Sequence, residues 1–344
     1  MKRYSPIWEL FISRMRMFYR EPDAMFWTYG FPVLLTVGLG LAFRNKPPEQ
    51  VHAALQDAPA LSEIRKTLDA DLSFKVRSGS VEQCESWIRK GEVDIAILQG
   101  EPLEYRFDPT RPEATVARLK IDEVIQHAAG RLDVVAVKEA HVTAPGARYV
   151  DFLIPGLLGM NLMGGGLWGI GFVTVDMRIR KLLKRMVATP MKKRDFFFSL
   201  IASRMVFTVP EVLLLMLTGW LLFHVAIEGS WLNITVVCVV GALSFAGIGL
   251  FCASRARKIE TISGLMNAVM LPMWIFSGIF FSAKRFPEIL QPFIQALPLT
   301  QLINALRAVI TDGASLFSQW LPLSVLAAYG LVSFVLALRW FRWT

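Results

Sequence analysis

Six long runs of apolar residues divide the chain, and shorter polar segments separate most of them. A helix rises about 1.5 Å per residue, so runs of this length reach across the hydrocarbon core of a bilayer. The runs cover residues 25–43, 152–175, 205–227, 231–253, 262–281 and 320–338. The pattern predicts an α-helical polytopic membrane protein with six transmembrane helices, the last five of them within residues 150–344.

Residues 44–149 differ from the rest of the chain because they contain no long apolar run. They carry 15 Lys and Arg against 17 Asp and Glu. Ser80 with Gln83, and Thr110 with Glu113, have the spacing of capping boxes that open helices. Strand-like segments alternate with the helical ones, at residues 51–55, 72–77, 93–98 and 103–107. This pattern predicts a small α/β domain inserted after the first apolar run.

Two further helices are predicted from apolar stripes. The first covers residues 5–20 of the N-terminal segment 1–24, and Glu21-Pro22 ends it. One face is apolar and the other mostly basic, which fits a helix lying in the membrane interface. The second begins at Pro112 in the inserted domain and is expected to run to near Lys138. Its predicted buried stripe contains Val116, Leu119, Val124, Ile125, Leu132 and Val135.

A strongly basic segment, residues 176–195, joins the second apolar run to the third; we call it the basic segment. It contains eight Lys or Arg and two Asp. Its apolar residues recur at helical spacing, which predicts an amphipathic helix over residues 178–186. The Thr189-Pro190 step is expected to end that helix, because proline disfavours helix just before itself.

Two interpretations of the basic segment remain open. It is a topology anchor, because positive charge alone holds short loops in the cytoplasm, or it is a docking helix that receives force from a cytoplasmic partner. The residues assigned to docking are Arg178, Arg180, Lys181, Leu182, Leu183, Lys184, Arg185, Met186, Thr189 and Pro190.

The distribution of Lys and Arg predicts the orientation. The N-terminal segment, residues 176–204, the 254–260 turn and the C-terminus together hold 19, whereas the opposite short loops hold three. Both termini are therefore expected in the cytoplasm, with residues 44–149 on the other side. Residues 283–319 are also expected there, as two short re-entrant helices at the outer membrane face.

Few polar residues lie inside the apolar runs. Glu211 is a candidate functional carboxylate, because carboxylates inside a membrane are costly. The favoured alternative is a structural pair with Arg204, seven residues earlier on the same helix face and near the cytoplasmic edge. The glycine-rich second run predicts close helix packing, with Gly165 and Gly169 at a dimer interface or along a pathway. Asn161 and Asn267 are equally consistent with interhelical hydrogen bonds and with substrate contacts.

Composition excludes several classes of function. The chain is 54% hydrophobic with a formal net charge of +9, but its basic residues gather at membrane edges, so no nucleic-acid partner is expected. The cysteines, Cys84, Cys238 and Cys252, lack metal-ligand spacing. The chain has no phosphate-binding P-loop and no nucleophile–base pair, so it is not expected to be an enzyme or to bind a cofactor or metal.

Several stretches together resemble the ABC-2 family, the membrane permeases of ATP-binding-cassette exporters. The resemblance covers nearly the whole chain and is carried by FYREPDAMFWTYGFPVLL, DFLIPGLLGMNLM, RKLLKRMVATPMKKRDF, SRARKIETISGLMN, LPMWIFSGIFFSAKRFP and LPLTQLINALRAVI. It implies a permease that dimerises with itself or a homologue and binds two copies of an ATPase subunit, which hold ATP and Mg²⁺. The basic segment would be the coupling helix, and the first, second and fifth spans would line the export route.

The expected function is therefore that of an exporter permease in a bacterial inner membrane, surrounded by membrane lipids. The abundant Phe, Met and Trp favour an amphiphilic or hydrophobic substrate, such as a drug, a lipid or a lipid-linked product. The alternative is a membrane-anchored sensor or assembly scaffold with residues 44–149 as its binding domain. An ion-coupled transporter is disfavoured, because no chain of charged residues crosses the membrane.

Overall fold

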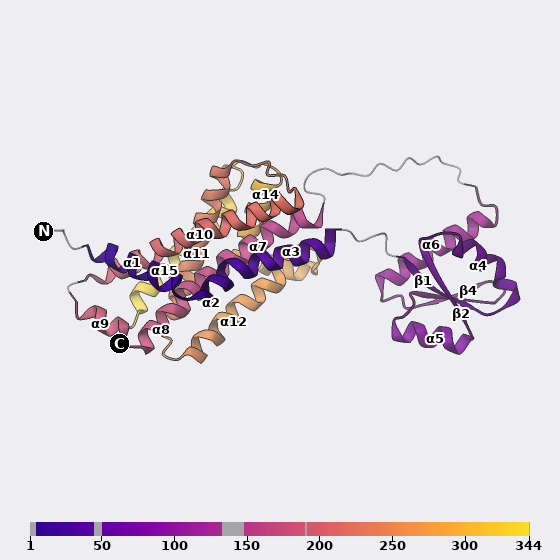
Figure 1. The fold of residues 1–344 in the computed structure, drawn as a ribbon, viewed down its shortest axis with the longest axis horizontal. Coiled ribbons are helices and arrows are strands. Elements are labelled where there is room, and N and C mark those ends of the chain that lie inside the picture. The colour runs from indigo at the N-terminus through magenta and orange to yellow at the C-terminus, as the bar shows by residue number, and fades with distance from the viewer. Residues whose placement is uncertain (1–4, 45–49, 133–147, 190, 344) are drawn as a thin grey trace. The chain divides into compact units, whose positions relative to one another are not determined.

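The computed structural model describes residues 5–44, 50–132, 148–189 and 191–343. The chain forms two compact units: residues 1–44 with 142–344, and residues 45–141. The first is a bundle of helices and the second contains a small sheet covered by helices (Figure 1). The second unit lies within the polar segment that the sequence separates from the apolar runs.

Six helices in the described part of the chain are long and apolar enough to cross a membrane, which agrees with the expected number. We call them the first to sixth spans. They cover Pro22–Ala42, Tyr149–Ile179, Arg194–Phe223, Trp231–Ala253, Ile259–Phe276 and Trp320–Trp340.

The first two spans each contain a π-helical segment between α-helices. The first span is built from α2 (Pro22–Met25), the π-helical turn Phe26–Gly30 and α3 (Phe31–Arg44). The second is built from α7 (Tyr149–Gly166), the π-helical segment Leu167–Phe172 and α8 (Val173–Ile179). The irregularity in the first span directly precedes Pro32, which has no N–H to continue the α-helical ladder.

The other four spans are single helices. They are α10 (Lys193–Phe223), α11 (Trp231–Ala253), α12 (Ile259–Phe276) and α15 (Trp320–Trp340). The third span starts well before residue 205. Its first turns can be buried because the hydroxyls of Ser199 and Ser203 donate to carbonyls of the same helix and Phe196 packs inside the bundle. The fifth ends at Phe276 rather than at residue 281, and Gly278 follows in the left-handed conformation with φ +79°.

The second and fourth spans form the interior of the bundle, whereas the first, fifth and sixth are mostly exposed. The second and fourth spans approach closely at glycines, since a Cβ on Gly249 would overlap the carbonyl oxygen of Gly166. The glycine-rich second span therefore packs against protein, as its composition predicts.

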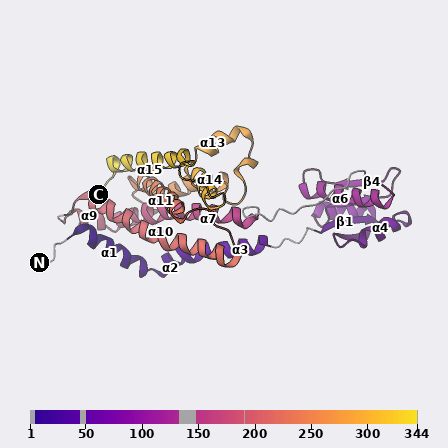
Figure 2. The ribbon, with the colours of Figure 1, turned by 90° about the horizontal axis from the view of Figure 1, so that it is seen from above.

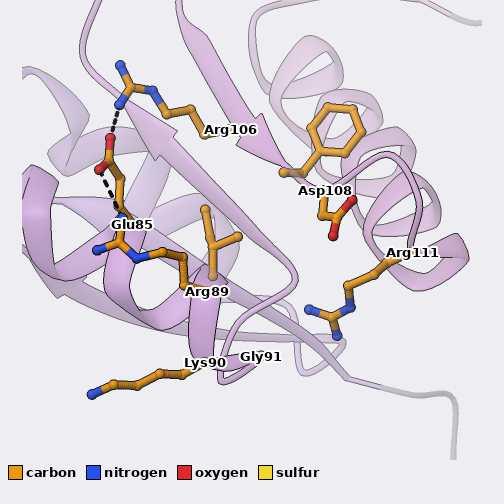
Figure 3. A pocket seen from close by; sticks show the side chains of 9 residues that line it. Glu85, Arg89, Lys90, Gly91, Arg106, Asp108 and Arg111 are labelled. Atoms are coloured by element: carbon orange, nitrogen blue, oxygen red, sulfur yellow. Dashed lines mark hydrogen bonds and ion pairs between the residues drawn. The ribbon is translucent and has the colours of Figure 1, made fainter.

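Short helices complete the bundle. α1 (Pro6–Tyr19) packs on α10, and α9 (Leu182–Val187) follows α8. Residues 283–319 contain the 3₁₀ turns Ala283–Arg285 and Glu288–Leu290, then α13 (Gln291–Ala296) and α14 (Pro298–Ile310). α13 and α14 meet at 86°, and α14 is buried against α7, α11 and α15. Protein therefore covers the backbone of α14, as its place among the spans requires. Figures 1 and 2 both place α1, α9 and the C-terminal end of α15 at one end of the bundle.

The α/β unit contains a four-stranded sheet in the order β2-β1-β3-β4. The strands are β1 (Val51–Gln56), β2 (Phe74–Gly79), β3 (Ile95–Leu98) and β4 (Glu104–Phe107). β1 pairs in parallel with β2 and β3, and β4 pairs antiparallel to β3. α4 (Ser62–Asp69), which follows the 3₁₀ turn Pro59–Leu61, and α6 (Pro112–Ala128) cover one face of the sheet. α5 (Val81–Lys90) covers the other face.

All four strands lie where the sequence predicts them, and Ser80 and Gln83 form the expected capping box of α5. The expected capping box at Thr110 and the expected length of the following helix are wrong. Arg111, not Thr110, precedes α6, and the Thr110 hydroxyl instead donates to Asp108. α6 ends at Ala128 rather than near Lys138, and Val135 lies outside the described residues. Of the expected stripe, Val124 and Ile125 are half-buried against the core, whereas Val116, Leu119 and Leu132 are exposed. The fully buried residues of α6 are Ala114, Ala117 and Ile121.

Candidate coupling segment and buried polar pair

The basic segment is folded as two helices with a sharp break between them. The second span continues to Ile179, and α9 begins at Leu182. Lys181 stands at the break with φ +59°, a left-handed conformation that is uncommon for a residue with a side chain. The single helix expected over residues 178–186 is therefore split. Thr189 follows α9 and donates its hydroxyl to the Met186 carbonyl; Pro190 lies outside the described residues.

α9 turns its apolar side toward the bundle and its cationic side away from it. Leu183 is fully buried, and Leu182 and Met186 are half-buried against the same apolar cluster. That cluster also draws residues from α8, α10, α11 and α15, so α9 shares one apolar cluster with four spans. The exposed residues of this stretch are Ile179, Arg180, Lys181, Lys184, Arg185, Val187, Ala188 and Thr189. Leu182, Leu183 and Met186 therefore hold α9 in place, and the side available to a partner is the cationic one.

Arg178 belongs to the bundle and not to the exposed surface. Its guanidinium is buried and donates to the carbonyls of Ala253 (2.8 Å), Ala256 and Ser254 just where α11 ends. Its Nε donates to the carbonyl of Arg342 at 3.0 Å. The last carbonyls of a helix have no partner within the helix, so Arg178 satisfies the end of the fourth span.

The C-terminal tail, Phe341–Arg342–Trp343, lies beside the same residues. The Arg342 N–H donates to the Ser254 carbonyl at 3.1 Å, and the Arg178 guanidinium lies 5.0 Å from the centre of the Phe341 ring. Both aromatic rings of the tail pack edge-to-face against Phe197 at the start of α10. The tail therefore ties the end of the fourth span to the start of the third, next to α9.

The buried polar pair, Arg204 with Glu211, forms within α10. Arg204 Nη2 lies 2.7 Å from Glu211 Oε2, and the two side chains are only 5% and 1% exposed. The expected pairing is therefore present, but the expected place for Arg204 is wrong. Arg204 does not reach out from the membrane edge, because α10 extends ten residues further toward the N-terminus and neighbouring helices cover the pair.

The second span contacts this pair directly at one of its two predicted glycines. A Cβ on Gly165 would overlap the Arg204 guanidinium, while one on Gly169 would come no closer than 3.9 Å to Arg204 Cδ. Gly165 therefore packs against Arg204 of the same chain, at a position that the sequence assigns to a dimer interface or a pathway. Asn161, one turn before Gly165, is half-buried, and its Nδ2 has no hydrogen-bond partner in the described part of the chain. Asn267 is separate from the group, on an exposed face of α12.

The sequence pattern does not predict one residue of this neighbourhood, Arg14, because it counts as part of the mostly basic face of the first helix. Arg14 of α1 donates its Nη2 to the Gly169 carbonyl at 3.2 Å, within the π-helical segment of the second span. Phe18, four residues later, stacks on Phe207 of α10 with ring centres 4.2 Å apart. The four-residue spacing from Phe18 places Arg14 on the packed face, and that spacing was the available signal.

These features define an integral membrane protein with six candidate spans, an inserted α/β unit and a cationic segment between the second and third spans. Comparison with known protein families identifies the family of membrane proteins to which the chain belongs. Residues 23–339 match the model described as "ABC-2 family transporter protein", so the chain belongs to this family, the transmembrane components of ABC transporters.

Individual relatives cover less of the chain. "Inner membrane transport permease YhhJ" of Escherichia coli is 29% identical over 132 residues, which are 38% of this chain and 35% of that protein. "ABC transporter G family member 20" of Dictyostelium discoideum is 24% identical over 174 residues, 50% of this chain and 24% of that protein. The chain thus spans about a third of the length of the bacterial permease and a quarter of the other.

Proposed function

We propose that this chain is the permease subunit of an ATP-driven exporter and that a separate ATPase docks on the basic segment. One observation carries the proposal: α9 is packed firmly on its apolar side and presents a cationic side between the second and third spans. A short element with a rigid base and an exposed charged surface is suited to receive force from a partner. ATP and Mg²⁺ bind to that partner, and this chain moves the substrate.

The docking surface consists of exposed residues on both sides of the break at Lys181. Arg180, Lys184 and Arg185 supply positive charge, while Ile179 and Val187 are 41% and 43% exposed and supply apolar contact. The complementary partner is a groove with an apolar floor and an acidic rim. Because α9 belongs to an apolar cluster that includes residues of four spans, a push on this surface reaches more of the bundle than the two spans it joins.

The assembled transporter contains two permeases, this chain with itself or with a homologue, and two ATPases. The mostly exposed first and fifth spans leave apolar faces for that association and for lining a route. In this arrangement α9 and both termini face the cytoplasm, and the α/β unit lies outside. The apolar spans favour an amphiphilic substrate, moved outward from the cytoplasm or the inner leaflet.

Charge reversal tests the docking surface. The variant Lys184→Glu/Arg185→Glu is expected to lower co-purification of the ATPase that associates with the wild-type chain by about tenfold, because like charges then face each other. The matched control Lys284→Glu/Arg285→Glu makes the same charge change in the loop after α12 and is expected to leave binding unchanged. If the first variant binds the ATPase and supports its turnover as the wild type does, the docking assignment is wrong.

A further inference from the structure

One face of α1 carries a stripe of polar side chains with an acidic and a basic end. Glu9, Ser13, Arg16 and Arg20 are spaced four, three and four residues apart, so they lie in one row along the helix. Together with Ile12 and Met17 they line a hollow of about 230 Å³. Arg14 and Phe18, which contact the second and third spans, lie on the opposite side of the helix. The stripe therefore faces away from the bundle.

The two arginines of this stripe are exposed, and the described residues offer them no side-chain partner. Within the described part of the chain, neither Arg16 nor Arg20 forms an ion pair or a side-chain hydrogen bond, and both are exposed. They lie four residues apart, so their guanidinium groups can converge on one anion. Guanidinium groups bind phosphate in a bidentate manner, which makes a phosphate group the matching anion.

The position of the stripe relative to the membrane indicates where such a phosphate comes from. The first span begins at Pro22, two residues after Arg20, so the basic end of the stripe lies where the chain enters the bilayer. Trp8 and Tyr19 are 58% and 59% exposed on a neighbouring side of α1. Exposed Trp and Tyr are typical of the headgroup level. A row of charges at this depth meets lipid headgroups first.

We propose that this face of α1 is a binding site for a membrane phospholipid whose headgroup carries a phosphodiester and a primary amine. Arg16 and Arg20 hold the phosphate, and Ser13 lies between them and Glu9. The Glu9 carboxylate accepts a hydrogen bond from the ammonium, which a quaternary amine cannot donate. Ile12 and Met17 contact the apolar part of the lipid. The inference requires only that the chain spans a membrane, so it stands independently of the proposed ATPase.

The test uses the full-length chain in nanodiscs of phosphatidylcholine with small amounts of phosphatidylethanolamine or phosphatidylglycerol. Native mass spectrometry then counts the lipids retained by each chain. The wild type is expected to retain phosphatidylethanolamine in preference to the other two. Arg16→Gln/Arg20→Gln is expected to weaken that retention by about tenfold, as charge-assisted hydrogen bonds are lost. Glu9→Gln should keep the phosphate contact but lose the preference over phosphatidylglycerol.

Lys284→Gln/Arg285→Gln is the matched control, because it removes two exposed positive charges from the turn after α12, and its lipid retention should equal that of the wild type. Unchanged thermal unfolding in pure phosphatidylcholine shows that each variant is folded. Wild-type retention by Arg16→Gln/Arg20→Gln would overturn the site, and equal retention of all three lipids by the wild type would overturn the headgroup assignment. Retention of inorganic phosphate by the wild type in pure phosphatidylcholine, and not by Arg16→Gln/Arg20→Gln, would identify a free anion instead and would also overturn the proposal.

Discussion

Arg14, Arg148, Arg178 and Arg307 share one role, since each donates to backbone carbonyls of a helix other than its own. Arg148 binds the Phe223 carbonyl at the end of α10 (2.8 Å), and Arg307 binds the Gly278 carbonyl just after α12. Arg178 binds the end of α11, and Arg14 binds the π-helical part of the second span. Open carbonyls are costly in a bilayer, and guanidinium groups can satisfy several at once. At these positions arginine is part of the fold.

The contact between Gly165 and Arg204 gives a prediction at this scale. Gly165→Leu is expected to break the buried pair of Arg204 with Glu211 and to lower the free energy of unfolding by about 3–5 kcal/mol. Membrane insertion should remain intact, because Leu inserts more favourably than Gly. Gly164→Leu is the matched control, since a Cβ there meets nothing within 4 Å. Thermal unfolding in detergent measures both variants, and equal midpoints would contradict the predicted contact.

At the scale of elements, the C-terminal tail is expected to hold α9 in position through the apolar cluster they share. Phe341, Trp343 and Leu183 all belong to that cluster, although they are far apart in sequence. α9 has only six residues, too few for a stable helix in isolation, so its order depends on this packing.

Phe341→Ala/Trp343→Ala is therefore expected to speed amide hydrogen exchange across residues 182–187 by about tenfold, because opening α9 then costs less free energy. Trp340→Ala is the control; Trp340 is 47% exposed and is not a member of the cluster, although it packs on Phe251 at the cluster's edge. The measurement needs neither the ATPase nor a substrate. Unchanged exchange in α9 would show that the tail does not position it.

At the scale of the whole molecule, the two units have separate apolar cores. The sheet of residues 45–141 buries its own residues on both faces. We expect residues 45–141 to fold alone and to melt cooperatively when followed by circular dichroism. A gradual loss of signal on heating would contradict an independent domain.

The same unit should lose stability in acid. Hydrogen bonds from Ser73 lower the pKa of Asp71, and hydrogen bonds from Thr110 lower the pKa of Asp108. A carboxyl with a lowered pKa in the folded state stabilises that state above its unfolded pKa of about 4, and this contribution is lost as pH falls through the folded value. The melting temperature of the unit is therefore expected to decrease at pH values below about 4. This decrease should be smaller in Asp71→Asn/Asp108→Asn than in the wild type.

The sequence by itself determined the features that depend on neighbouring residues. Runs of apolar side chains located six spans, short strand-like segments located four strands, and the spacing of Ser80 and Gln83 located a helix start. Each signal is local, because burial in lipid or in a core acts on every residue of a run or stripe together. The ABC-2 resemblance also followed from stretches of sequence, and the match over residues 23–339 confirms it.

Only the tertiary structure decided which face of each element is covered. Leu183 fits a docking stripe equally well in the sequence, yet it is buried, and Arg178 looks like a surface charge although it closes a helix 75 residues away. Arg14 and Gly169 are 155 residues apart, and Gly165 meets a guanidinium from another span. Such partners depend on where distant segments of the backbone lie in the fold. An arginine carries the same charge whether it lies at a membrane edge or donates to a buried carbonyl, so its charge does not distinguish the two places.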